Sequence, residues 1–393
     1  MSGDMENKNY IYLDNASSTK TDGRVIDEMM PYIKDFYGNP SSVHQAGADA
    51  REGLEKARSQ AAVLINSNPE EIYFTSCGTE SNNFALNGIM EANRSKGNHI
   101  ITSSIEHLSI LNPLKELKKK GFEVTIVPVD TKGFVFSEEI KKAIRPDTVL
   151  ISIMHANNEI GTIQKIKEIS DIAKKSEIIM HSDGVATAGI IPINVNELGI
   201  DALSFSSQQM YGPKGAAALY IRKGVKIKPL ILGGVQERGR RAGTENIPAI
   251  VGFGKACEIA KFEMEKNSHM LIKLRGRLIK GITDNIKEIT LNGSIESRLP
   301  GNVHISFEYI EGESIVLFLN MKGITVATGS SCASQALKVS HVCTSIGLGQ
   351  ATAQGSILFS IGKYNTEADI DKVIEVLPPI IEKLRMMSPL YKG

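Results

Sequence analysis

The sequence predicts an α/β protein whose largely parallel sheet is covered by helices on both faces. Short apolar runs alternate with helix-length amphipathic stretches, a pattern typical of parallel sheets because each crossover helix returns the chain to the same sheet edge. Polar clusters follow several of these runs. The composition, 41% apolar and 23% charged, is that of a globular protein. A chain of 393 residues exceeds one ordinary core, so we expect two domains.

The elements are predicted in order from periodicity and turn signals. Helix-period apolar positions predict helices over residues 27–36 and 48–64, joined by the turn-rich GNPSS at 38–42. The predicted strands are residues 71–74, 99–102, 123–128, 148–154, 178–181, 202–205 and 216–221. After Asn246 a long helical stretch leads to a smaller α+β part. We therefore expect an N-terminal segment (1–25) that joins the small domain, a large α/β domain (26–267) and a small domain (268–393).

Charge and apolar patterning exclude several classes of partner. The formal net charge is +1, so neither nucleic acid nor an anionic membrane is an expected partner. No run approaches the roughly 18 apolar residues of a membrane span, and residues 1–9 lack a signal-peptide core. We expect a cytoplasmic protein. The four cysteines have no metal-ligand spacing and no disulfide framework, so buried structural thiols are the simplest interpretation for most of them.

Polar residues follow the predicted strands at the sheet edge where ligands of parallel sheets gather. Gly78 and Thr79 come between a strand and a helix, where free backbone N–H groups and a hydroxyl suit a phosphate. Thr79 could equally be a simple N-cap. Four further polar residues follow other strands: His107, Asn158, Asp183 and Ser206. The first three are, singly, more typical of caps or buried hydrogen-bonded groups.

The order and spacing of these clusters resemble the cysteine desulfurases of the NifS and IscS type. These are class V aminotransferase-family members among the fold type I pyridoxal-phosphate (PLP) enzymes. The resemblance covers nearly the whole chain and is carried by YLDNA (12–16), GNPSS (38–42) and GTES (78–81), residues 106–107 and 155–161, GPKG (212–215), and residues 233–246. It implies a seven-stranded, mostly parallel sheet in the large domain. It also implies a homodimer with active sites shared across the interface.

The resemblance also assigns roles in holding PLP. It implies that Thr79 and Ser206 contact the phosphate beside Gly78, and that Thr244 reaches it from the other subunit. It places the His107 imidazole on the pyridine ring and makes this residue a candidate catalytic group. Asp183 would pair with the ring nitrogen, which makes the ring an electron sink, and Asn158 would bond the phenolic oxygen.

The chain departs from the family pattern at four positions. The family's histidine and Schiff-base lysine correspond to Gln208 and Gln209. An amide nitrogen has a delocalised lone pair, so Gln209 can neither condense with an aldehyde nor shuttle a proton. A glutamine of the family is Ala186, and its substrate-carboxylate arginine is Leu358. An archaeal-looking subgroup that lacks the lysine is the closer resemblance.

Residues 327–342 match the family's persulfide loop and contain Cys332. Cys332 could be a buried thiol, but small neighbours in a loop favour a functional sulfur. Our first hypothesis is a homodimeric partner of an IscU-type iron–sulfur scaffold, with PLP non-covalent or absent and Cys332 as persulfide acceptor or [2Fe–2S] ligand. The alternative is an active PLP-dependent cysteine desulfurase that yields L-alanine and a persulfide on Cys332. A PLP enzyme for another substrate ranks last.

Overall fold

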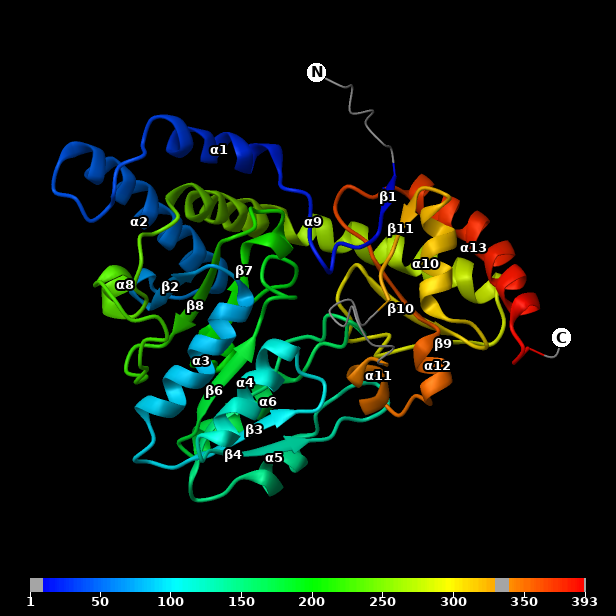
Figure 1. The fold of residues 1–393 in the computed structure, drawn as a ribbon, viewed down its shortest axis with the longest axis horizontal. Coiled ribbons are helices and arrows are strands. Elements are labelled where there is room, and N and C mark those ends of the chain that lie inside the picture. Colours follow the sequence, from blue (N-terminus) through cyan, green and yellow to red (C-terminus); the bar gives the residue numbers. More distant parts are fainter. Residues whose placement is uncertain (1–9, 329–338, 392–393) are drawn as a thin grey trace.

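The central feature of the computed structural model, which describes residues 10–328 and 339–391, is a seven-stranded sheet (Figure 1). Its strands are β2 (Ile72–Thr75), β3 (His99–Ser103), β4 (Glu123–Val127), β5 (Thr148–Ser152), β6 (Ile179–Asp183), β7 (Ala202–Ser206) and β8 (Ala217–Ile221). The order is β2-β8-β7-β6-β5-β3-β4. β8 is antiparallel to both neighbours and the other pairs are parallel. The predicted α/β class and mostly parallel seven-stranded sheet are confirmed.

Helices cover both faces of this sheet because its strands alternate buried side chains between two cores. Tyr73 packs with α3 (Gly78–Ala92) and α4 (Leu108–Lys119) on one face. Ile72 and Phe74 pack on the other, with α2 (Gln45–Ile65), α6 (Ile166–Lys175) and the start of α9. The remaining elements of this part are α1 (Gly23–Lys34), η1 (Pro69–Glu71), α5 (Ser137–Ala143), α7 (Val195–Leu198), η2 (Ser207–Met210) and α8 (Gln236–Gly239).

One helix, α9 (Ile247–Asn285), runs through both parts of the molecule (Figure 1). Asn246 starts it by accepting a hydrogen bond from the N–H of Ala249, and a proline lies in the first turn, where no N–H is needed. Its residues up to Met264 belong to the core of the large sheet, whereas those from Leu271 belong to a second core. The domain boundaries drawn from the sequence stay a prediction.

The second core contains a small antiparallel sheet of order β12-β10-β9, formed by β9 (Ile289–Leu291), β10 (Asn302–Phe307) and β12 (Ser356–Ser360). α10 (Gly312–Asn320) and α13 (Glu367–Met387) cover it, and α11 (His341–Ser345) and α12 (Gln350–Gln354) precede β12. Near the N-terminus β1 (Ile11–Tyr12) pairs in parallel with β11 (Ile324–Thr325), so the first described residues join this part. Within the described ranges, no helix is long and apolar enough to cross a bilayer.

Candidate active site

A cavity of about 800 Å³ lies between the carboxyl ends of the central strands and the small sheet. It brings together nearly all the residues that the sequence singled out from separate strand ends. The predicted residues on its wall are Gly78, Thr79, His107, Asn158, Asp183, Ser206, Ala186, Gln208, Gln209 and Leu358. The strand-end rule therefore located the cavity, because parallel strands deliver the residues that follow them to one edge.

The N-terminus of α3 forms one wall with its backbone donors open. Cys77 is the N-cap, and its side chain makes no capping hydrogen bond. A Cβ at Gly78 would lie 2.6 Å from Cγ2 of Val185, so only glycine lets this turn pack there. Thr79, in the same turn, is exposed and lines the cavity. Open N–H groups at the positive end of a 15-residue helix provide a site for a phosphate.

A buried carboxylate, Asp183 at the end of β6, faces the same cavity. Its Oδ1 accepts from the N–H of Val185 at 2.9 Å and its Oδ2 from Nδ2 of Asn82 at 2.7 Å. Burial raises the pKa of Asp183, while these two hydrogen bonds and the nearby His107 oppose the rise. A cationic N–H partner in the cavity would therefore stabilise the charged carboxylate.

His107 serves as the N-cap of α4, which fixes its ring at the cavity wall. Nδ1 accepts from the N–H of Ser109 at 3.1 Å and lies 2.7 Å from the hydroxyl of the same serine. Asn82 Nδ2 donates to that hydroxyl at 2.8 Å, which links His107 to Asp183. The capping interpretation of His107 is correct, and the cap leaves Nε2 available to the cavity.

Position 209, in η2, presents an amide. Gln209 Nε2 donates to the carbonyl of Ala16 at 2.9 Å. The nearby Lys214 is engaged elsewhere, since its Nζ donates to the carbonyl of Thr19 at 3.0 Å, and it is not a lining residue. Of the described lining residues, Lys115 is the single lysine or arginine, and its Nζ bonds Asn112. Apart from Lys115, the described lining residues therefore offer no amine to the cavity.

The side of the cavity formed by the small sheet is largely apolar. Leu358 on β12 is 4% exposed and lies opposite His304 of β10 in the strand register. Leu271, Leu299 and Ile361 line the same side, and Ala186 lines the cavity after β6. Among the described lining residues, this wall offers no arginine to a substrate carboxylate, in keeping with the leucine at position 358.

Two predicted residues lie elsewhere. Thr244 is exposed and is not a lining residue of this cavity, so within one chain it does not meet Thr79 or Ser206. Cys332 lies outside the described residues, although Thr328 and Val339, on either side of that gap, both line the cavity. Of the other cysteines, Cys257 and Cys343 are buried as expected, whereas Cys77 is exposed.

Sequence reasoning missed the buried residues that connect the site. Asn82 joins Asp183 to Ser109, and its Oδ1 is a buried acceptor without a partner among the described residues. Asn82 is three residues after Thr79 and so shares a helix face with it, which was the available signal. His304 was also missed, although β10 alternates apolar and polar residues and its polar face points away from the second core.

The mostly parallel sheet with helices on both faces is the fold of the fold type I PLP-dependent transferases, and an open helix N-terminus, an imidazole and a carboxylate line one cavity at its strand ends. The chain belongs to the aminotransferase class-V family, whose model matches residues 11–373. It is 52% identical over 385 residues to the cysteine desulfurase IscS of Methanosarcina thermophila, covering 98% of this chain and 95% of that protein.

Other relatives are also similar to this chain over nearly its whole length. The cysteine desulfurase IscS 1 of Archaeoglobus fulgidus is 51% identical over 381 residues, which is 97% of this chain and 99% of that protein. A solved NifS-like protein matches with a TM-score of 0.90 at 40% identity, covering 95% of this chain and all of the other. The resemblance stated from the sequence motifs is confirmed.

Proposed function

We propose that this protein mobilises sulfur from L-cysteine for iron–sulfur cluster assembly, as a PLP-dependent cysteine desulfurase whose PLP is held without a covalent bond to residue 209. This proposal is carried by the sequence similarity, over nearly the whole chain, to proteins named cysteine desulfurase. That similarity favours catalysis over a purely binding role. A structural relative described as SspA in complex with cysteine, 34% identical with a TM-score of 0.81, adds support for L-cysteine as the substrate.

The residues present fit PLP at three points and fail at one. The open N–H groups at Gly78 and Thr79 suit the phosphate, Asp183 suits the ring nitrogen, and His107 lies on the same wall. At Gln209 an amide replaces the amine that would bond the aldehyde. When bound, PLP supplies an aldehyde for the cysteine amino group and an electron sink. Retention of the group must then rest on non-covalent contacts.

The side chains of this chain divide the remaining work. His107 Nδ1 is occupied by Ser109, so Nε2 is the atom that exchanges a proton with the substrate. We assign the sulfur acceptor to Cys332. Its thiolate attacks the cysteine sulfur, the Cβ–S bond breaks, an S–S bond forms, and Cβ gains a proton so that L-alanine leaves. Thr244, exposed on this chain, is proposed to complete the phosphate site of the other subunit in a homodimer.

A second candidate function follows from two observations at the cavity wall. The Gln209 amide bonds the Ala16 carbonyl, and Leu358 forms the wall where a substrate carboxylate would need a cation. These two features favour a homodimer without turnover that binds an IscU-type scaffold. There Cys332 would accept persulfide from elsewhere or complete a [2Fe–2S] cluster as a soft ligand.

One assay separates the two candidates. The purified full chain, with PLP added, is incubated with L-cysteine and a thiol reductant, and L-alanine and sulfide are measured. Alanine that depends on added PLP and disappears in Cys332→Ala supports the desulfurase. No alanine, together with a coloured scaffold complex that Cys332→Ser abolishes, establishes the binding role. Alanine formation that survives Cys332→Ala overturns the assignment of the sulfur acceptor.

A further inference from the structure

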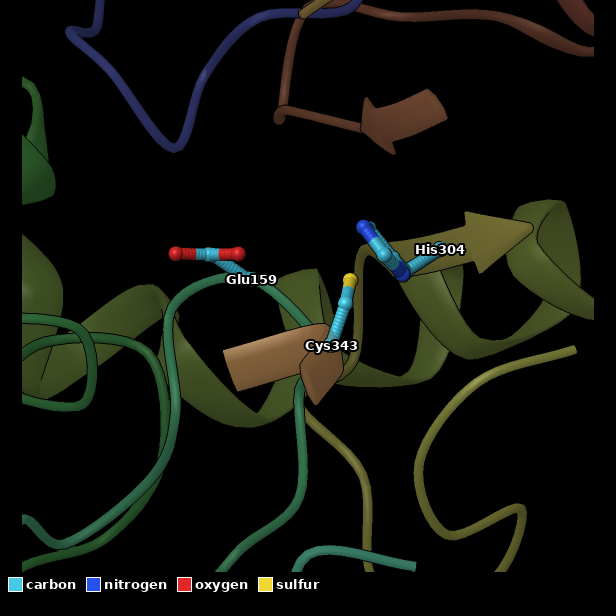
Figure 2. A group of neighbouring side chains, drawn as sticks. All are labelled: Glu159, His304 and Cys343. Carbon is cyan, nitrogen blue, oxygen red and sulfur yellow. The ribbon is translucent and has the colours of Figure 1, made fainter. Parts of the chain in front are cut away.

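Three potential metal ligands from distant parts of the sequence meet beside the cavity (Figure 2). They are Glu159 in the turn after β5, His304 on β10 and Cys343 on α11. One ligand atom of each lies within 4.8 Å of the others, and the residues are 8%, 0% and 0% exposed. The proposed sulfur chemistry uses none of them.

The local fold holds Glu159 against β10. Asn302 Nδ2 donates to the backbone carbonyl of Glu159 at 2.8 Å. Gly161 has a positive φ of 74°, and a Cβ there would lie 2.4 Å from Oδ1 of Asn302, so the turn docks on β10 only because this residue is glycine. Ser340 donates to Oε2 of Glu159 at 2.5 Å, which leaves Oε1 for a further ligand.

One ring nitrogen of His304 lacks a hydrogen-bond partner among the described residues. Its Nδ1 lies 3.0 Å from Nδ2 of Asn292, whereas Nε2 is fully buried and has no partner in the described part of the chain. Asn292 Oδ1 is a second buried atom without one. A buried imidazole N–H without an acceptor is destabilising, because no hydrogen bond replaces those it made to water.

Rotating the Asn292 amide by half a turn gives His304 Nδ1 an acceptor, while the amide NH2 moves to the buried position where Oδ1 has no partner in the described part of the chain. In the structure the Ser306 hydroxyl lies 2.7 Å from Nδ2 of Asn292. After the rotation Oδ1 takes the place of Nδ2 and accepts from a protonated Nδ1 of His304 and from the Ser306 hydroxyl. Ser356, 2.7 Å from Ser306, supplies the hydrogen bond that Ser306 then needs. The Nε2 lone pair of His304 is left free to face Glu159 and Cys343. Orientation of a ligating histidine by a carbonyl on its other nitrogen is a common feature of metal sites.

We infer that Glu159, His304 and Cys343 form a binding site for a divalent cation of the Zn²⁺ class. Thiolate, imidazole and carboxylate are the three ligand types of protein zinc, and Mg²⁺ or Ca²⁺ would require oxygen ligands throughout. The thiol and the carboxyl group each release a proton on binding, so two negative charges balance the cation in a buried site. Ligand atoms around tetrahedral zinc lie about 3.5 Å apart, which small side-chain rotations from 4.8 Å achieve.

The site would join the two parts of the molecule. Glu159 comes from the large sheet, whereas His304 and Cys343 come from the part that contains the small sheet. Glu159 also lines the cavity, so the fourth coordination position faces it and would hold water. The inference does not depend on the proposed sulfur chemistry, because Cys332 and PLP take no part in it.

The test uses the full chain with Cys332→Ser, so that this thiol cannot contribute. Chelator-treated protein is loaded with Zn²⁺ alone and desalted, and its metal content is measured. We expect about one zinc per chain, a rise of several degrees in Tm, and loss of both in Cys343→Ala and His304→Gln. Co²⁺ in place of Zn²⁺ should give a thiolate-to-metal charge-transfer band and the visible bands of four-coordinate cobalt.

Cys257→Ala is the matched control, because Cys257 is equally buried and contacts Met210 in the other core. It should retain the zinc. If Cys343→Ala does not fold, Glu159→Gln carries the test, since an amide keeps an oxygen for Ser340 and removes the ligand charge. Zinc retained by the ligand variants, less than half an equivalent in the Cys332→Ser chain without further changes, or a cobalt spectrum without the thiolate band would each overturn the inference.

Discussion

Asn82 donates both of its amide hydrogens inward, to Asp183 Oδ2 at 2.7 Å and to Ser109 Oγ at 2.8 Å. This single side chain therefore couples the carboxylate assigned to the PLP ring nitrogen with the serine that fixes His107. These hydrogen bonds fix the orientation of the carboxylate, so that it stays at the cavity wall. The strength of PLP binding should depend on its charge.

Asp183→Asn should weaken PLP binding by about 10- to 100-fold, because a hydrogen bond to a charged partner contributes roughly 1.5–3 kcal/mol. The measurement is a spectroscopic titration of the PLP-free protein with PLP. Asp171→Asn is the control, because Asp171 is a half-buried residue of α6, away from the cavity, that pairs with Lys167. Equal affinity in native protein and Asp183→Asn would contradict the assigned role of Asp183.

Gln209→Lys should convert non-covalent PLP into covalently bound PLP. Gln209 is at the cavity wall with its Nε2 on the Ala16 carbonyl, and a lysine there would present an amine in the same place. Borohydride treatment followed by mass spectrometry should show one PLP adduct on residue 209, absent from the native chain. Gln208→Lys, which also lines the cavity, tests whether any added lysine reacts. An adduct of similar yield in both variants would show that position 209 is no better placed than position 208 to react with PLP.

The sequence predicted the site where chemistry depends on strand ends, and failed where it depends on packing between distant segments. His107, Asp183 and Ser206 follow strands of one sheet, so topology alone brings them together. By contrast Glu159, His304 and Cys343 have no common spacing, and only the docking of β10 and α11 on the turn after β5 assembles them. The role of Thr244 at the phosphate stays a prediction, because within one chain this residue does not line the cavity.

A buried ion pair should stabilise the loop that follows β8. Arg58 Nη2 and Nη1 contact the Glu237 carboxylate at 2.7 and 2.8 Å, with side chains 3% and 2% exposed. Glu237 also accepts from the N–H of Phe74 and has a positive φ of 47°. Removing one partner leaves a buried charge unpaired, so Arg58→Ala should destabilise the protein by about 3–5 kcal/mol.

The effect is measured as a loss in Tm and in the urea midpoint. Lys280→Ala, which breaks the exposed pair with Asp284, is the comparison and should change stability by no more than about 0.5 kcal/mol. If the two variants lost equal stability, the argument from burial would fail. A Glu237→Ala variant should lose about as much as Arg58→Ala, and the double variant less than the sum of the two.

Glu106 should make stability fall as pH rises. It is buried at the cavity wall, where it accepts from the Ser103 hydroxyl at 2.5 Å and from the N–H of Met154 at 3.0 Å. Burial raises its pKa from 4.5 to about 8, against the effect of these hydrogen bonds. Between those values the unfolded chain has released the proton and the folded chain keeps it, so rising pH favours unfolding, by at most about 1.4 kcal/mol per pH unit. Above the folded pKa both states are ionised and the dependence ends.

Glu106→Gln removes this titration while keeping an oxygen that can accept from Ser103 and Met154. Relative to the native chain, the variant should therefore gain Tm steadily as pH rises from 4.5 to about 8, the window set by the two pKa values. If the Tm of the native chain and of Glu106→Gln changed in parallel with pH, Glu106 would have the same pKa in the folded and unfolded states. Glu138→Gln, at an exposed residue of α5 paired with Lys141, controls for the loss of one surface carboxylate and should leave the profile unchanged.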